Sequence, residues 1–137
     1  MSVQFEDNSV KVKQAITNAA IAFLYEACGE LEAQVKRNTK VDTGRTKASW
    51  GYAVDEGALE GTVGSGYENA IWEEFGTGEY ALNNDGRKGG WKYQDLRGQW
   101  HYTRGKQPRR ALFNAFNTKK NRIIKMAEQR LGGISNA

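Results

Sequence analysis

The residue types that most often carry catalysis are few and scattered in this 137-residue chain. Its single histidine, His101, lies in an aromatic segment far along the chain from its single cysteine, Cys28, so a nucleophile and base pair or a His/Cys zinc site is not expected. Glu73 and Glu74 are adjacent acids, but neighbours on a helix point about 100° apart and would not face one substrate atom. The sequence therefore predicts a protein without catalytic residues, metal or cofactor.

A glycine-spaced stretch is the other candidate for chemistry. Gly64 and Gly66 precede a short helical segment, and glycines before a helix can form a phosphate-binding loop. The surrounding residues 61–78 hold acidic side chains and no Lys or Arg, so they would repel a phosphate. We expect the chain to change direction there and to continue as a helix that buries Ala70, Ile71 and Phe75. The acids of this helix, Glu68, Glu73 and Glu74, should stay in water.

Charge is distributed unevenly along the chain. Residues 48–86 contain eight acidic residues and no basic one, whereas residues 87–137 contain thirteen basic and two acidic residues. Two solvated faces of opposite sign would explain this pattern, and so would head-to-tail attraction between identical copies. On the second interpretation, acids of one copy face bases of the next: Glu68, Glu73, Glu74 and Glu79 against Arg104, Lys106, Arg109 and Arg110.

A hairpin expected at residues 90–104 interleaves aromatic and basic side chains. Trp91 and Tyr93 share one face of a strand, and Trp100 and Tyr102 share a face of the next. Surfaces of this composition bind single-stranded nucleic acid by base stacking and phosphate contact. Packing of the same aromatics on the core or on a neighbouring subunit is the competing interpretation, and the acidic middle of the chain disfavours nucleic acid as the main ligand.

The remaining pattern predicts the elements that position these residues. A long helix is expected at residues 10–37, with an apolar stripe that includes Val12, Ile16, Ala27 and Val35, and a second long helix near residues 108–131. A hairpin at residues 50–63, a short helix, a polar loop at residues 79–90 and the second hairpin lie between them. The prediction is a single α+β domain over residues 1–137, with two long helices on one face of a small antiparallel sheet.

The ends and turns of this domain have their own signals. Residues 1–8 are expected to be a lead-in and residues 132–137 a tail. Asp7, Asn8 or Ser9 should cap the first helix, and Asp42 or Thr43 the segment after it. Cys28 should be a buried apolar residue. No apolar run is long enough to cross a membrane and no signal peptide is evident, so we expect synthesis in the cytoplasm and no membrane contact.

Four short motifs occur in a fixed order: Val41–Gly44 followed by Ser49, Val63-Gly64 followed by Tyr67 and Ala70, Glu74–Thr77, and Pro108–Leu112. Together they resemble the tail-component family of long-tailed double-stranded DNA bacteriophages, over roughly Asn8 to Leu131. The resemblance implies a non-enzymatic structural protein of the virion neck, of the kind called tail-completion or head-tail joining protein.

The resemblance also implies partners. Identical copies would form a ring, as a hexamer or alternatively a dodecamer, between the head connector or adaptor and the tail terminator or tail tube. Non-specific contact with DNA in the channel would follow. Such a protein is made in the cytoplasm of the host bacterium and resides in the virion. The alternative function is a basic nucleic-acid-binding protein that uses the second hairpin and the C-terminal helix.

Overall fold

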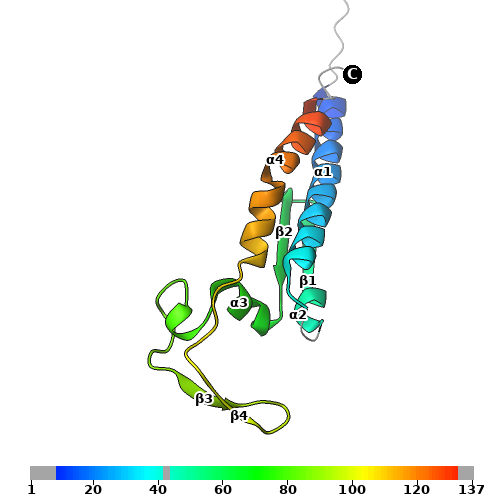
Figure 1. Cartoon of the computed structure of the whole chain (residues 1–137). Coiled ribbons are helices and arrows are strands. Elements are labelled where there is room, and N and C mark those ends of the chain that lie inside the picture. The colour runs from blue at the N-terminus through cyan, green and yellow to red at the C-terminus, as the bar shows by residue number, and fades with distance from the viewer. Residues whose placement is uncertain (1–8, 42–43, 133–137) are drawn as a thin grey trace, which may run out of the picture.

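The computed structural model describes residues 9–41 and 44–132. Its elements follow in the order α1 (Ser9–Asn38), α2 (Arg45–Ala48), β1 (Trp50–Asp55), β2 (Glu60–Ser65), α3 (Glu68–Phe75), the 3-10 turn η1 (Gly78–Tyr80), β3 (Trp91–Gln94), β4 (Trp100–Thr103) and α4 (Ala111–Gly132). The molecule is elongated, with α1 and α4 side by side at one end and the β3–β4 hairpin at the other (Figure 1). The predicted α+β class with two long helices is confirmed.

Some sequence predictions fall on residues that the structure does not describe. The helix caps proposed at Asp7 and Asn8 and at Asp42 and Thr43 lie outside the described residues. The same holds for the lead-in at residues 1–8 and for residues 133–137 of the tail.

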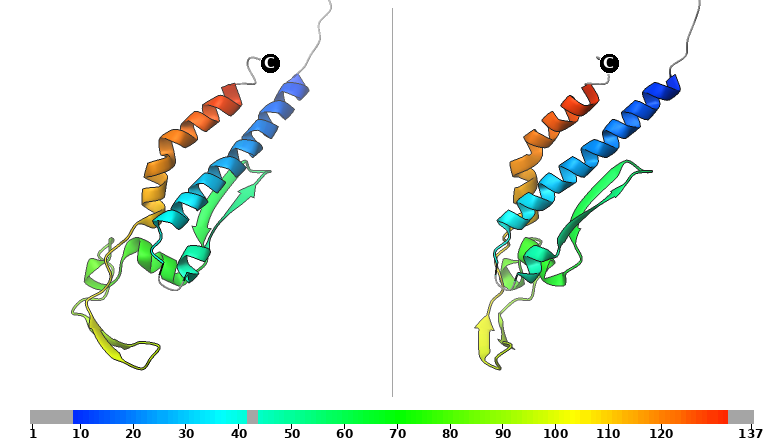
Figure 2. Two further views of the ribbon diagram at one scale, coloured as in Figure 1. Left: turned by 45° about the vertical axis from the view of Figure 1, so that its right-hand side comes forward. Right: turned by 90° about the vertical axis from the view of Figure 1, so that its right-hand side faces the viewer.

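The strands form two separate antiparallel hairpins instead of one sheet. In the first, Trp50 pairs with Ser65 at the open end and Asp55 with Glu60 at the turn. Helix α1 packs along this hairpin, and α4 packs along α1 (Figure 2). The second hairpin stands apart because the segments that lead to and from it pair with each other and carry it beyond α3.

The core is small and lies where α1, β1, α3 and the start of α4 meet. It contains Val35, Trp50, Ala70, Ala111 and Ala115. The indole N–H of Trp50 donates to the hydroxyl of Thr39 at 2.9 Å, and that hydroxyl donates to the carbonyl of Val35 at 2.7 Å. The buried polar atoms here are thus paired, and the three alanines let the helices approach closely.

The apolar stripe predicted for α1 is buried only in its second half. Ala27 and Val35 are buried, whereas Val12 and Ile16 are 47% and 45% exposed. The turn of the first hairpin meets α1 at Tyr25, whose hydroxyl donates to Glu56 at 3.1 Å, and therefore leaves the earlier turns of the helix uncovered. The prediction that Val12 and Ile16 belong to the core is wrong for the single chain.

Candidate functional site

Two segments that are far apart in the sequence meet where the chain leaves α3 and where it returns to α4. We call residues 73–79 and 104–113 the junction. Three backbone hydrogen bonds join its halves: Thr77 N–H to the carbonyl of Lys106 (2.8 Å), Glu79 N–H to that of Arg104 (2.9 Å), and Arg109 N–H to that of Glu73 (2.7 Å). This short ladder fixes the base of residues 80–103, which we call the arm and which carries β3 and β4.

Close backbone contact in the junction requires glycine at three positions. Gly76, Gly78 and Gly105 all have positive φ, at 76°, 61° and 125°. A Cβ at Gly105 would collide with the carbonyl of Thr77, and one at Gly76 would collide with Pro108. The sequence motifs Glu74–Thr77 and Pro108–Leu112 therefore form one structural unit.

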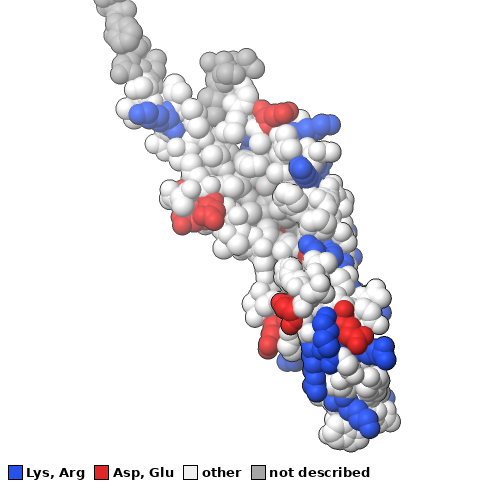
Figure 3. Space-filling model, turned by 90° about the vertical axis from the view of Figure 1, so that its left-hand side faces the viewer, with Lys and Arg blue, Asp and Glu red and all other residues white. Residues whose placement is uncertain are grey.

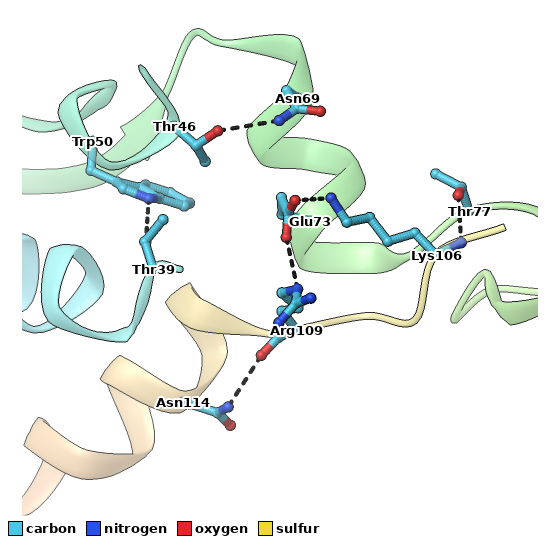
Figure 4. A network of polar contacts seen from close by, with 9 residues as sticks. All are labelled: Thr39, Thr46, Trp50, Asn69, Glu73, Thr77, Lys106, Arg109 and Asn114. Atoms are coloured by element: carbon cyan, nitrogen blue, oxygen red, sulfur yellow. Dashed lines mark hydrogen bonds and ion pairs between the residues drawn. The ribbon is translucent and has the colours of Figure 1, made fainter. Parts of the chain in front are cut away.

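Glu73 binds the returning segment through its carboxylate. One oxygen pairs with the ammonium of Lys106, and the other lies 3.2 Å from Nε of Arg109 (Figure 4). Glu79 and Arg104 make a looser pair at 3.9 Å. Partly exposed ion pairs contribute only about 0 to 1 kcal/mol each, so their main effect is to orient the arm relative to the helices.

Glu74 is buried and caps the N-terminus of α4. Its two carboxylate oxygens accept hydrogen bonds from the amides of Leu112 and Phe113, at 2.9 and 3.0 Å. The helix begins after Arg110, whose side chain has no acceptor, so the cap must come from elsewhere. The expectation that Glu74 stays in water is wrong, because the free amides and dipole of α4 stabilise its negative charge in this position.

The acids and bases singled out in the sequence mostly find one another within one chain. Glu73 pairs with Lys106 and Arg109. Glu79 pairs with Arg104, and Glu74 lies 3.4 Å from Nε of Arg110. Among the described residues, Glu68 has no ion pair. Pairing of these groups between copies therefore stays a prediction, and most of them already have partners in their own chain.

The arm presents Tyr93, Trp100 and Tyr102 to solvent, whereas Trp91 is half-buried under the guanidinium of Arg87. Its register pairs Lys92 with Tyr102 and Gln94 with Trp100, which places these four on one face and Trp91 and Tyr93 on the other. Trp100 and Tyr102 are 67% and 60% exposed. Because the arm projects beyond α3 (Figures 1 and 2), these aromatics do not cover the helices of their own chain.

Asp95 organises the turn at the tip of the arm. One carboxylate oxygen accepts the amides of Arg97 and Gln99, both at 2.9 Å, and the other lies 2.7 Å from Nε2 of His101. The hydrogen bond from His101, followed by the bond from the Gln99 amide, holds the pKa of Asp95 below its usual value. The ring of His101 also stacks on Tyr93, so the arm is a defined hairpin.

An apolar groove of about 530 Å³ opens beside the core. Residues of α1 lie at its base, and its walls come from β2, α3 and the first turns of α4. The wall residues Ile71, Phe75, Phe113 and Phe116 are between 42% and 55% exposed. The prediction that α3 buries Ile71 and Phe75 is wrong for the single chain, because α3 turns only Ala70 fully into the core.

The sequence pattern did not reveal this groove. The sequence feature that could have indicated it is the aromatic content of the junction. There, Phe75 and Phe113 lie on either side of Arg110, and the guanidinium of Arg110 is 5.7 Å from the ring centre of Phe75 and 4.3 Å from that of Phe113. A helical stripe predicts which residues share a face, but it does not tell whether another element of the same chain covers that face.

The described residues offer little that could perform a reaction. Within them, no group of His, Cys, Asp and Glu is arranged to hold a metal ion. Glu73 and Glu74 bind different partners, and burial raises the pKa of the Cys28 thiol. In residues 9–41 and 44–132, no helix has the length and apolar character needed to cross a membrane.

Comparison with protein families matches residues 4–76 to the family described as "Bacteriophage HK97-gp10, putative tail-component". The match spans just over half of the chain and runs from α1 to the junction. It includes the motifs Val41–Gly44 and Val63-Gly64 but not the arm or α4. No curated protein and no solved structure matches the chain.

Proposed function

We propose that this chain, which belongs to the HK97-gp10-like family of bacteriophage tail components, forms a ring in the neck of the virion that joins the head connector to the tail. Family membership makes it a structural protein of the phage tail that acts with other phage structural proteins in the virion. The ring and its place in the neck are our proposal. In it, the whole chain acts as one domain and six copies, or alternatively twelve, close the ring.

The observation that carries the proposal is the presence of two unlike exposed surfaces on one chain. The arm offers aromatic side chains beyond α3, and the groove offers half-exposed apolar side chains beside α4. Unlike surfaces that bind each other produce head-to-tail contacts, and such contacts close into rings when the rotation between copies allows. Exposed Trp and Tyr side chains are also the residues most often found as anchors in protein interfaces.

A test in the phage that encodes the chain would separate a neck role from other tail roles. An amber codon at Trp91 should yield DNA-filled heads and complete tails that are not joined, as seen by electron microscopy. Expression of the intact chain from a plasmid should restore joined particles. Absence of tails altogether, or normal joined particles, would contradict a role in the neck.

Binding to nucleic acid is the second candidate, because Lys92, Trp100 and Tyr102 share one exposed face of the arm. The basic residues of α4 support it less, since Lys119 and Arg122 pair with Glu30 of α1 and Arg130 pairs with Glu26. A gel-shift titration with single-stranded and duplex DNA at about 50 mM salt tests it, and no shift at this ionic strength would remove nucleic acid as a primary ligand.

A further inference from the structure

Some charged side chains have no ion-pair partner among the described residues. No ion pair joins the acids Asp55, Glu56, Glu60 and Glu68 to a basic residue within the described part of the chain. The first three lie around the turn of the first hairpin, and Glu68 opens α3. On the arm, the bases without an acidic partner among the described residues are Arg87, Lys88, Lys92 and Arg97. Asp85 of the arm also has no ion pair within the described residues, so the arm keeps four unpaired bases against one unpaired acid, whereas the first hairpin and the start of α3 keep only acids.

Two of these acids, Glu60 and Glu68, lie on elements that form walls of the groove. Strand β2 begins at Glu60 and supplies Val63 to the groove, and α3 begins at Glu68 and supplies Ile71 and Phe75. The groove is thus an apolar surface beside acidic side chains. Its complement would be an apolar anchor beside basic side chains.

The arm has this complementary composition. Trp100, the most exposed aromatic residue in the described part of the chain, lies on the same face as Tyr102 and Lys92. Lys and Arg side chains gather towards the arm end of the face shown in Figure 3. The junction holds the arm beyond α3 (Figure 1), and no residue of the arm lines the groove of the same chain.

We propose that the arm of one copy docks in the apolar groove of a second copy, with Trp100 inserted between Ile71, Phe75 and Phe116 and the basic residues of the arm beside Glu60 and Glu68 of that copy. This inference rests on the proposed ring and names the contact that builds it. The two surfaces are different, so each copy uses its arm on one neighbour and its groove on the other.

Two exposed positions allow the contact to be broken from either side. Trp100→Ser removes the anchor, and Ile71→Glu places a charge in the groove. Loss of a central Trp in an interface weakens binding by about 30-fold or more, so each variant should remain monomeric at concentrations where the wild-type chain associates. Leu82→Ser, at an exposed apolar residue of the arm outside its hairpin, and Ile124→Glu, at an exposed apolar residue of α4 that does not line the groove, are the matched controls and should associate as the wild type does.

Mixing the two variants tests the polarity of the contact. The Ile71→Glu chain has an intact arm, and the Trp100→Ser chain has an intact groove. Together they should form a dimer that grows no further, because the remaining arm and groove are both defective. Analytical ultracentrifugation of each variant and of the mixture measures this, with circular dichroism to confirm that every variant is folded.

The outcomes separate this inference from the proposed function. If the Trp100→Ser or the Ile71→Glu variant still assembles as the wild-type chain does, the arm-in-groove contact is wrong. The proposed ring would then have to be built by another contact. A mixture that stays monomeric, or a wild-type chain that stays monomeric at every concentration reached, would overturn it as well. The neck role is decided independently by the unjoined heads and tails of the amber mutant.

Discussion

Single residues at the junction decide how α3, the arm and α4 are oriented. Glu73 and Glu74 are neighbours in sequence but have different roles: Glu73 holds Lys106 and Arg109, and Glu74 accepts the first free amides of α4. The sequence shows two acids in a row and gives no sign of this difference, since it arises from which amides the fold brings near each carboxylate.

Replacement of Glu74 tests the cap directly. Glu74→Ala leaves two partly buried amides at the start of α4 without an acceptor and removes the charge beside Arg110, so the free energy of unfolding should fall by about 1 to 3 kcal/mol. The control is Glu68→Ala, since Glu68 is an exposed acid of α3, the helix that also carries Glu74. This variant should change the free energy of unfolding by about 0.5 kcal/mol or less. Urea denaturation of both variants measures the difference, and equal effects would show that Glu74 is not a structural cap.

The thiol of Cys28 should be slow to react. It is buried against Gly61, and burial raises its pKa, so the fraction of reactive thiolate near pH 8 is below that of a free cysteine. Alkylation by iodoacetamide in native buffer should be far slower than in guanidinium chloride, where the same thiol is exposed. Mass spectrometry of timed samples checks this, and equal rates in the two solvents would mean that the thiol is accessible in the folded chain.

At the scale of elements, helices and hairpins were predictable and their mutual packing was not. The spacing of apolar residues placed α1, α4 and the first hairpin within a few residues of their observed ends, because local periodicity sets these elements. The exposure of Val12, Ile16 and Ile71 could not be predicted in the same way. It depends on how far the first hairpin and the arm reach, which is set by contacts between distant segments.

The arm depends on the close approach of backbone at its base. Gly105→Ala places a methyl group against Thr77 at a φ of 125°, so the junction should open while α1 and α4 stay folded. Amide hydrogen exchange should increase at Thr77 and Glu79, whose N–H groups donate across the junction, with little change in helical circular dichroism. Gly66→Ala is the control, because Gly66 has open space around it and no positive φ. Unchanged exchange at Thr77 in Gly105→Ala would contradict this account of the arm's base.

The tip of the arm should respond to acid through Asp95. Its pKa is lower in the folded chain than the ordinary 3.8, so its stabilising effect on the turn is complete above about that pH and is lost as the pH falls through the folded value. Nuclear magnetic resonance of the Arg97 and Gln99 amides should report this transition. Asp95→Asn should abolish it, and the same acid transition in that variant would assign it to another group.

At the scale of the whole molecule, steering of one copy by the charges of the next stays a prediction. The acidic and basic parts of the sequence attract one another first within the chain, because the junction brings Glu73, Glu74 and Glu79 within 4 Å of basic side chains. A sequence shows the sign of the net charge of each segment. It does not show whether two opposite charges form an ion pair within one chain or between two copies. Only the charges left over can steer a neighbour.

Reversal of the leftover charges therefore tests long-range steering between copies. Glu60→Lys with Glu68→Lys should weaken self-association, and adding Lys92→Glu with Arg97→Glu to the same chain should partly restore it. Each exposed ion pair contributes only about 0 to 1 kcal/mol, so a single reversal should have little effect on self-association. The double reversal should weaken self-association measurably, because the same loss occurs at every contact around a ring. The loss should be largest at low ionic strength, since about 0.15 M salt limits electrostatic reach to about 8 Å. Sedimentation velocity over a range of salt concentrations measures both steps, and an acidic double variant that associates like the wild type at every salt concentration would show that apolar contact alone holds the copies together.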